Sequence, residues 1–319
     1  MTVRYRPMRP KDVRECVEIV ATHPVLAPRY GAAIKHLKAA WLGLLGRESF
    51  RAVVFEHVHG SDFRIIGCGV SAFVSDDFVS VLKKPPLSWV GPELVNRIIS
   101  GNPPLLSDKQ VREANRDGGL NLLVWEGAVR PEDSSSGEAL HAMFGAFTEQ
   151  HRGFLLKELI SHGVTVDTLQ GMLNSGGLFL SSDGRYVNSV GKPLTDILAA
   201  PHYFGLTRDL ARLRFGTWIG SLFAYEPPRF GLRPSEQRLL LTALRGRTDE
   251  ELAGELGISV SAVKKTWRSI YERAAARAPE LIETQVPAQE GALERGKEKK
   301  QHLLTHLREH LEELRPAAP

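Results

Sequence analysis

Basic residues gather in one segment near the C-terminus. Between residues 259 and 277 the sequence contains a single acid, Glu272, against five basic residues: Lys264, Lys265, Arg268, Arg273 and Arg277. On a helix, at about 100° per residue, the polar and basic residues fall on one stripe and the apolar residues on the opposite one. Cationic groups on such a face contact phosphates and base edges of duplex DNA. We therefore predict a DNA-contacting surface made of Thr248, Ser259, Ser261, Lys264, Lys265 and Arg268. The alternative is an ordinary charged, solvated helix face.

Two glutamates on expected strands, Glu56 and Glu126, are candidates for a general base, because a positioned carboxylate can accept a proton from a reacting group. A charged residue in a strand is more often an exposed residue at the edge of a sheet. We therefore predict no catalytic residue and no cofactor, and we keep the base as the alternative.

Three histidines, His302, His306 and His310, recur at every fourth position of an expected helix and could hold a metal ion. They flank a leucine face, and we expect no carboxylate or cysteine to complete a ligand set. Cys16 and Cys68 are the only cysteines, too few for a cysteine-built metal site or a disulfide framework. The sequence therefore predicts no metal site.

Three short helices are expected to position the basic segment. The first is bounded by Ser235 and Gly246, the second starts at a T-x-x-E capping box at Thr248, and the third starts at Ser259. Only two residues separate the second helix from the third, so these helices must cross sharply. The pattern predicts an all-α helix-turn-helix domain over residues 229–277.

The residues that follow, 278–319, read as a charged linker and an amphipathic C-terminal helix over Lys300–Leu314, which Pro316 ends. Leucines recur on one side of this helix. Two heptads are too few for a stable coiled coil alone, so the helix either docks on the protein or contributes to a homodimer.

The first part of the chain, residues 1–225, alternates strand-like and helix-like segments, which predicts an α+β domain. Helices are expected over residues 9–21, 31–45, 138–151 and 167–174. A hairpin is expected over residues 51–74, and further strands over residues 3–6, 120–129, 154–160, 177–180 and 215–225. The proline-rich residues 76–119 read as an irregular insertion with one short helix, typical of a lid or a partner surface.

The helical domain resembles the LuxR-type (GerE-like) helix-turn-helix of bacterial transcription regulators. The resemblance rests on Leu232–Glu236, Leu240, Gly246, Glu251–Ala253, Leu256–Ser259, Ala262–Lys264 and Ile270–Tyr271. It implies that the third helix reads an operator and that a further helix serves dimerisation. The family's usual Thr-Val-Lys is Ala262-Val263-Lys264 here, which removes one hydroxyl near the DNA backbone.

The first domain resembles the GNAT acyltransferase fold, a mixed sheet flanked by helices. The resemblance rests on Arg4–Asp12, Ile66–Val70 and Leu120–Val124. It implies that the loop after the fourth strand holds the pyrophosphate of coenzyme A at a helix N-terminus. That loop, Arg130–Glu138, lacks the family's second glycine and carries three acids, which would repel a pyrophosphate. We therefore expect a non-catalytic sensing or dimerising domain.

Taken together, these observations predict a sequence-specific DNA-binding transcriptional regulator, not an enzyme, with double-stranded DNA, a homodimer partner and a small-molecule effector. The alternative is an N-acyltransferase that uses acyl-CoA and carries a helical accessory domain. The 319 residues have a net charge of only +4 and are 42% hydrophobic, which excludes collagen-like and wholly disordered classes. We find neither a secretory signal nor an apolar stretch of membrane-spanning length, and expect a cytoplasmic protein without a membrane partner.

Overall fold

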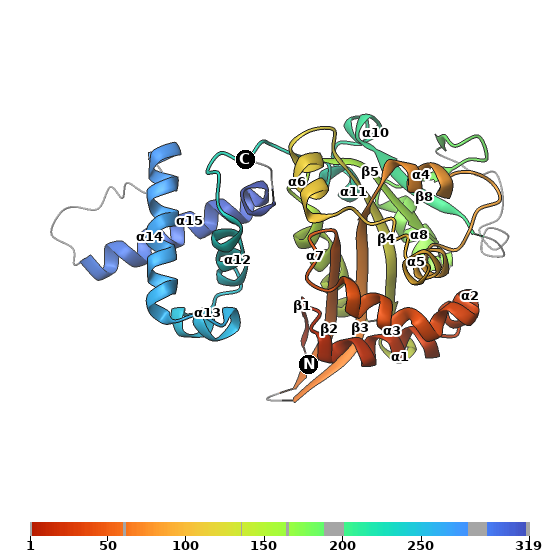
Figure 1. The fold of residues 1–319 in the computed structure, drawn as a ribbon, viewed down its shortest axis with the longest axis horizontal. Helices are drawn as coiled ribbons and strands as arrows, with labels where there is room; N and C mark the ends of the chain where they lie inside the picture. The colour runs from red at the N-terminus through yellow and green to blue at the C-terminus, as the bar shows by residue number, and fades with distance from the viewer. Residues whose placement is uncertain are drawn as a thin grey trace. The chain divides into compact units, whose positions relative to one another are not determined.

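The computed structural model describes residues 2–59, 62–134, 136–163, 166–187, 201–279 and 292–316. The chain forms two compact units (Figure 1). The first unit comprises Met1–His151 with Leu155–Ala224, and the second comprises Arg152–Phe154 with Tyr225–Pro319.

The first unit is built on one mixed eight-stranded sheet. Its strand order is β1-β2-β3-β4-β5-β8-β6-β7, in which β4 and β5 run parallel and the other neighbouring pairs run antiparallel. The strands are β1 (Thr2–Pro7), β2 (Phe50–His59), β3 (Asp62–Val74), β4 (Leu120–Val129), β5 (Leu156–His162), β6 (Leu178–Leu180), β7 (Tyr186–Val187) and β8 (Tyr203–Thr207). The predicted α+β class is confirmed: a mixed sheet flanked by helices.

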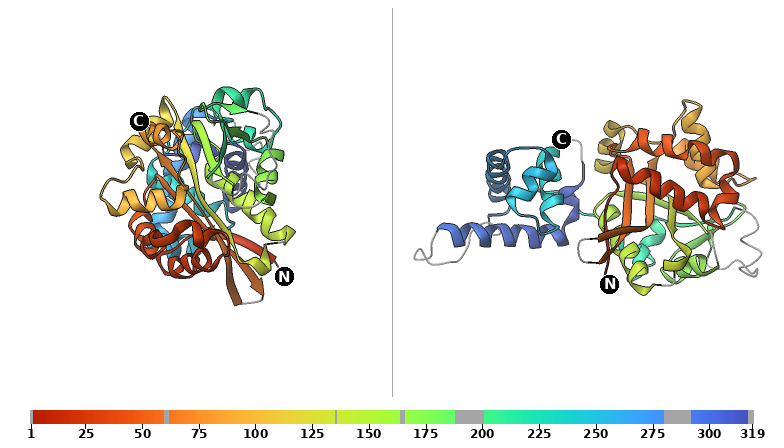
Figure 2. Two further views of the ribbon diagram at one scale, coloured as in Figure 1. Left: turned by 90° about the vertical axis from the view of Figure 1, so that its right-hand side faces the viewer. Right: turned by 90° about the horizontal axis from the view of Figure 1, so that it is seen from below.

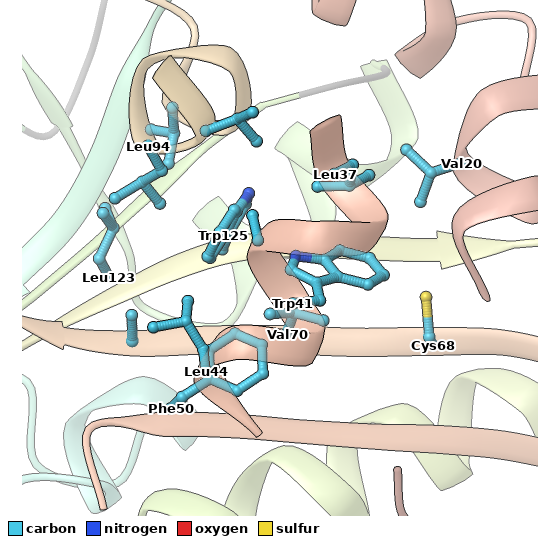
Figure 3. Packing of buried hydrophobic residues seen from close by; sticks show 14 of the residues in the cluster. Val20, Leu37, Trp41, Leu44, Phe50, Cys68, Val70, Leu94, Leu123 and Trp125 are labelled. Carbon is cyan, nitrogen blue, oxygen red and sulfur yellow. The ribbon is translucent and has the colours of Figure 1, made fainter. Parts of the chain in front are cut away.

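Helices cover both faces of the sheet. The helices α1 (Val13–Thr22), α2 (Leu26–Tyr30) and α3 (Ile34–Leu44), drawn in red, lie over one face (Figure 2). There the largest buried cluster forms, in which Trp41 and Trp125 meet edge to face at 6.2 Å (Figure 3). The helix α7 (Gly137–His151) packs small residues such as Ala142 and Ala146 on the other face.

The expectation of an irregular insertion over residues 76–119 is wrong. This segment contains three helices, namely α4 (Asp76–Leu82), α5 (Val90–Ile99) and α6 (Asp108–Arg116). The side chains of Ser75 and Ser107 cap the first and the third of these helices. Buried residues of α5, such as Leu94, join the largest core cluster, so the prolines mark the spacers between helices.

The expected strand over residues 215–225 is also wrong. Thr217 accepts a hydrogen bond from the backbone of Gly220 and starts the short helix α11 (Trp218–Ser221), which follows α10 (Arg208–Arg212). The strand next to β5 on this side of the sheet is β8, and β6 and β7 follow it.

The second unit contains the helices α12 (Pro234–Ala243), α13 (Asp249–Leu256), α14 (Val260–Arg277) and α15 (Ala292–Glu309) and the 3-10 helix η5 (Leu311–Leu314). The first helix is capped at Arg233 and not at Ser235, because Pro234 takes the first helical position. The last helix starts at Ala292, earlier than expected, and ends before the predicted Leu314. The expected linker lies partly in residues 280–291, outside the described residues.

Leucines of the C-terminal segment complete the core of this unit. Leu303 and Leu307 of α15, with Leu311 and Leu314 of η5, are buried in the same cluster as Trp267 of α14. The docking alternative for this helix is therefore confirmed. Because these leucines are buried, they cannot form a homodimer interface. The homodimer itself stays a prediction. Within the described residues, every helix is too short or too polar to span a membrane.

Candidate active site

The geometry of the site starts with the two parallel strands at the centre of the sheet. The β4–β5 ladder joins Leu120–Leu123 to Leu156–Ile160, and the printed pairs of β4 beyond Leu123 are with β3 alone. The register between β3 and β4 shifts where Val70 faces Glu126, so that Trp125 is an extra residue in β4. Such a bulge re-aims the side chains beside it. Here it brings both Trp125 and Glu126 to the same partner, Tyr30.

Glu126 is a buried acid held by hydrogen bonds. Its carboxylate accepts hydrogen bonds from the Tyr30 hydroxyl at 3.0 Å and from the Gly127 backbone at 3.2 Å. The Trp125 indole donates to the oxygen of Tyr30 at 3.2 Å, which fixes the phenol. Burial raises the pKa of the Glu126 carboxyl to about 7, although Tyr30, Gly127 and the charge of Arg29 oppose this rise. A carboxyl with such a pKa exchanges protons at neutral pH.

Tyr30 packs so closely on Gly91 that no residue with a Cβ atom fits at position 91. It ends α2 and lies against Gly91 in the first turn of α5, and a Cβ atom at position 91 would collide with the phenol ring. The close contact ties the insertion between β3 and β4 to the site. The helix α5 therefore helps to position the hydroxyl that holds Glu126.

A second cluster lies beyond the end of the β4–β5 ladder. The Arg29 guanidinium lies over the Trp89 ring at 4.1 Å and donates to the carbonyl of Gly163 at 3.4 Å. Trp89 also contacts the ring of His162, at the end of β5, edge to face at 6.3 Å. Burial, and then the charge of Arg29, lower the pKa of His162 to about 4, so its imidazole is neutral at physiological pH. Its buried Nδ1 has no hydrogen-bond partner among the described residues.

Glu56, the other candidate base, is in a different environment. It is buried on β2, where Arg4 donates to it at 3.0 Å and Arg6 at 2.8 Å. A carboxylate paired with two guanidinium groups is a poor proton acceptor. The expectation that both glutamates are exposed strand charges is wrong, since each is 3% exposed. Glu126 is the one with the environment of a base.

The loop Arg130–Glu138 is less repulsive to anions than its acids imply. Its buried Asp133 accepts two hydrogen bonds from Arg64, both at 2.9 Å, and contacts Nε2 of His57 at 3.0 Å. The pairing offsets the charge of the acid that lies deepest in the loop. The Ser136 hydroxyl accepts a hydrogen bond from the Ala139 backbone and caps the start of the 15-residue helix α7.

The six residues predicted to contact DNA are all exposed, and all lie in the second unit. Two of them cap helices: the Thr248 hydroxyl accepts a hydrogen bond from Glu251 at 3.2 Å, and Ser259 accepts one from Ala262 at 3.1 Å. The other four lie along α14, at Ser261, Lys264, Lys265 and Arg268. The hydroxyl groups of Thr248 and Ser259 therefore have a structural role as helix caps.

One solved structure is similar to this chain. A solved structure described as "histone acetyltransferase HPA2 and related acetyltransferase" from Corynebacterium glutamicum is similar to this chain at 11% identity. The match has a TM-score of 0.36 and covers 64% of this chain and 95% of that one. No family model matches the chain. No curated protein matches it. Values this low do not by themselves establish a shared fold.

These findings correct two expectations. The prediction of a DNA-binding transcriptional regulator is wrong: no family model of a LuxR-type helix-turn-helix matches, and the structural neighbour is titled an acetyltransferase. The prediction that the protein is not an enzyme is wrong for the same reason. The physical reason for the error is that a basic, exposed helix face is a feature of many solvated helices and does not single out DNA as a partner.

Several site residues escaped the sequence analysis. Tyr30, Arg29 and Trp89 lie on helices or at a helix cap, far in sequence from the strand they serve. For Tyr30, the available signal was a tyrosine followed directly by a glycine, Gly31, at the end of a helix. His162 was ordinary in sequence, because its burial arises from the neighbouring strand β8 and from Trp89.

Proposed function

We propose that this protein is an N-acyltransferase that transfers an acyl group from acyl-CoA to an amine. The first unit is the catalytic domain, and the second is a helical accessory domain in which α12, α13 and α14 form a helix-turn-helix arrangement. The observation that carries the proposal is the buried Glu126, with its pKa near 7, at the point where β4 and β5 cease to pair.

Glu126 acts as the general base. An amine nucleophile is protonated near neutral pH and must lose a proton before its nitrogen can attack a thioester carbonyl. The carboxylate takes that proton, the C–N bond forms, and the C–S bond of the thioester breaks. Coenzyme A leaves as a thiolate and takes up a proton. A positioned general base contributes about 10²–10⁴-fold to such a rate.

The neighbours of Glu126 position it. Tyr30 donates to the carboxylate and stabilises its ionised form, while Trp125 keeps the phenol in place. The neutral His162 and the Trp89 ring are a largely apolar surface beside the charge of Arg29. Burial keeps the pKa of the Glu126 carboxyl high, although the charge of Arg29 opposes this rise.

Two features support the binding of the acyl-CoA substrate. Beyond Leu123 the ladder to β5 ends, which leaves backbone groups of β4 available to hydrogen-bond an extended thiol arm. The N-terminus of the 15-residue helix α7 offers the positive end of its dipole to a pyrophosphate. The pairing of Asp133 with Arg64 lowers the repulsion that this loop would otherwise exert.

Turnover with a panel of amines tests the proposal. The full chain is incubated with acetyl-CoA and primary amines, including lysine-containing peptides, and the release of free thiol is followed. We expect thiol release that depends on an amine, and Glu126→Gln should lower kcat by about 10²–10⁴-fold while the affinity for acetyl-CoA stays unchanged. Glu18→Gln, at an exposed position on α1, is the matched control. Equal turnover by wild type and Glu126→Gln, or no binding of acetyl-CoA, would refute the proposal.

A further inference from the structure

We propose that Glu226, His310 and Glu312 in the second unit bind one divalent metal ion, of which Zn²⁺ fits best. Each residue offers one ligand atom, and these atoms lie within 4.8 Å of one another. Glu226 precedes α12, His310 follows α15, and Glu312 belongs to η5. The three residues are thus brought together by the fold of this unit, and the proposal is independent of the acyltransferase chemistry.

The two segments that carry the ligands are already fixed to each other. The Glu313 carboxylate accepts hydrogen bonds from the backbone of Arg229 at 2.7 Å and of Phe230 at 2.9 Å. Gln237 of α12 donates to the carbonyl of Arg315 at 2.8 Å. Because Glu313 is occupied in this way, its neighbour Glu312 is left to face His310. A ligand set held on such a fixed frame loses little entropy when the ion binds.

The donor set suits zinc. Glu312 is only 8% exposed, and one of its carboxylate oxygens lies 2.8 Å from Nδ1 of His310. Neither Glu226 nor Glu312 has a lysine or arginine ion-pair partner among the described residues. Zinc takes imidazole nitrogen and carboxylate oxygen ligands at about 2.0–2.2 Å, which places tetrahedral donors about 3.4 Å apart. His310 Nδ1 and the Glu312 oxygen therefore need to move apart slightly, the wider ligand pairs, at no more than 4.8 Å, need to close slightly, and a water completes the shell.

The ring of His306 and the cation of Arg229 lie near the proposed ligands. The two carboxylates and a neutral imidazole balance a divalent cation. The ring of His306 stacks on the ring of His310, with 4.2 Å between the two centroids. Arg229 is exposed, and its charge is screened by water.

The proposed ion would be structural. It would tie the segment that enters the second unit to the turn that ends it, since Glu226 lies far from His310 in sequence. The three histidines that recur along one helix are not the ligand set, because only His310 belongs to the cluster. The missing carboxylates come instead from another segment and from the turn after the helix.

Zinc binding by the full chain tests the proposal. The protein is stripped with a chelator and dialysed, then titrated with ZnCl₂ by calorimetry, with thermal unfolding as the second readout. We expect one zinc per chain, a rise in Tm with zinc, and at least about tenfold weaker binding in Glu226→Gln and in Glu312→Gln. Glu226 is exposed, so its variant keeps the fold, and His302→Ala, which changes an exposed histidine outside the cluster, is the matched control.

Two results would overturn the site. One is the absence of stoichiometric zinc binding by the stripped wild-type chain. The other is binding, with its rise in Tm, that is unchanged in Glu226→Gln and Glu312→Gln, which would place the ion elsewhere.

Discussion

Glu126→Gln is expected to make the free energy of unfolding of the first unit less dependent on pH. In the folded protein the pKa of this carboxyl is about 7, against an ordinary value of 4.5. The folded state therefore binds this proton more tightly than the unfolded chain does, so its contribution to stability is full below pH 4.5 and is lost as the pH rises through 7. At about 1.4 kcal/mol per pKa unit, the wild type should lose about 2–3 kcal/mol between pH 5 and pH 8.5 through this group alone.

Urea unfolding at pH 5 and at pH 8.5 measures this difference. The signal is tryptophan fluorescence, since four of the five tryptophans, all except Trp267, belong to the first unit. Comparing the two pH values within each protein cancels the hydrogen bonds that the glutamine itself gains or loses. Glu126→Gln should be about 2–3 kcal/mol less sensitive to this pH change than the wild type, and Glu18→Gln should behave as the wild type. If Glu126→Gln keeps the full pH dependence of the wild type, the carboxyl is not the buried, titrating group described here.

The other predictions concern activity, packing and substrate binding. For the wild type, kcat/KM should rise with pH through about 7, and Tyr30→Phe should move this rise to higher pH, because it removes a hydrogen bond that lowers the pKa of the base. An unchanged profile would exclude Tyr30 as a positioning group. Leu94→Ala should lower the free energy of unfolding by about 2–5 kcal/mol in urea titrations, since it empties a fully buried site; a loss below about 1 kcal/mol would argue against the packing of α5. Arg64→Met should weaken coenzyme A binding about fivefold by calorimetry, because Asp133 then loses the guanidinium that offsets its charge. Equal affinities for this variant and for the exposed-site control Arg47→Met would contradict the placement of the pyrophosphate.

Much of the first unit could be predicted from local sequence. The strand over residues 120–129 matches β4 throughout, and the hairpin matches β2 and β3 closely, because runs of Val, Ile and Phe around a turn have few alternatives. The predictions failed where tertiary contacts, and not local sequence, decide the secondary structure. The helices of residues 76–119 are short and separated by prolines, and it is the burial of residues such as Leu94 that stabilises them.

The site shows the same division. Glu126 was recognised as a candidate from its residue type and its strand, but its burial depends on Tyr30, which is 96 residues away. No local pattern reports such a contact. Charge alone misled the analysis in the second unit, because exposure of the basic stripe on α14 does not identify a partner. No local pattern connects Glu226 with His310 either, since the fold alone brings these two residues together.

Direct detection of the acylated product is the most direct test of the central claim, that Glu126 takes a proton from an amine during acyl transfer. Wild type and Glu126→Gln are incubated in parallel with acetyl-CoA and an amine substrate, and the N-acetylated amine is quantified by mass spectrometry. We expect the wild type to form the product, and Glu126→Gln to form it at least about 10²-fold more slowly. Product formation at equal rates in both proteins, or in neither of them, would contradict the account.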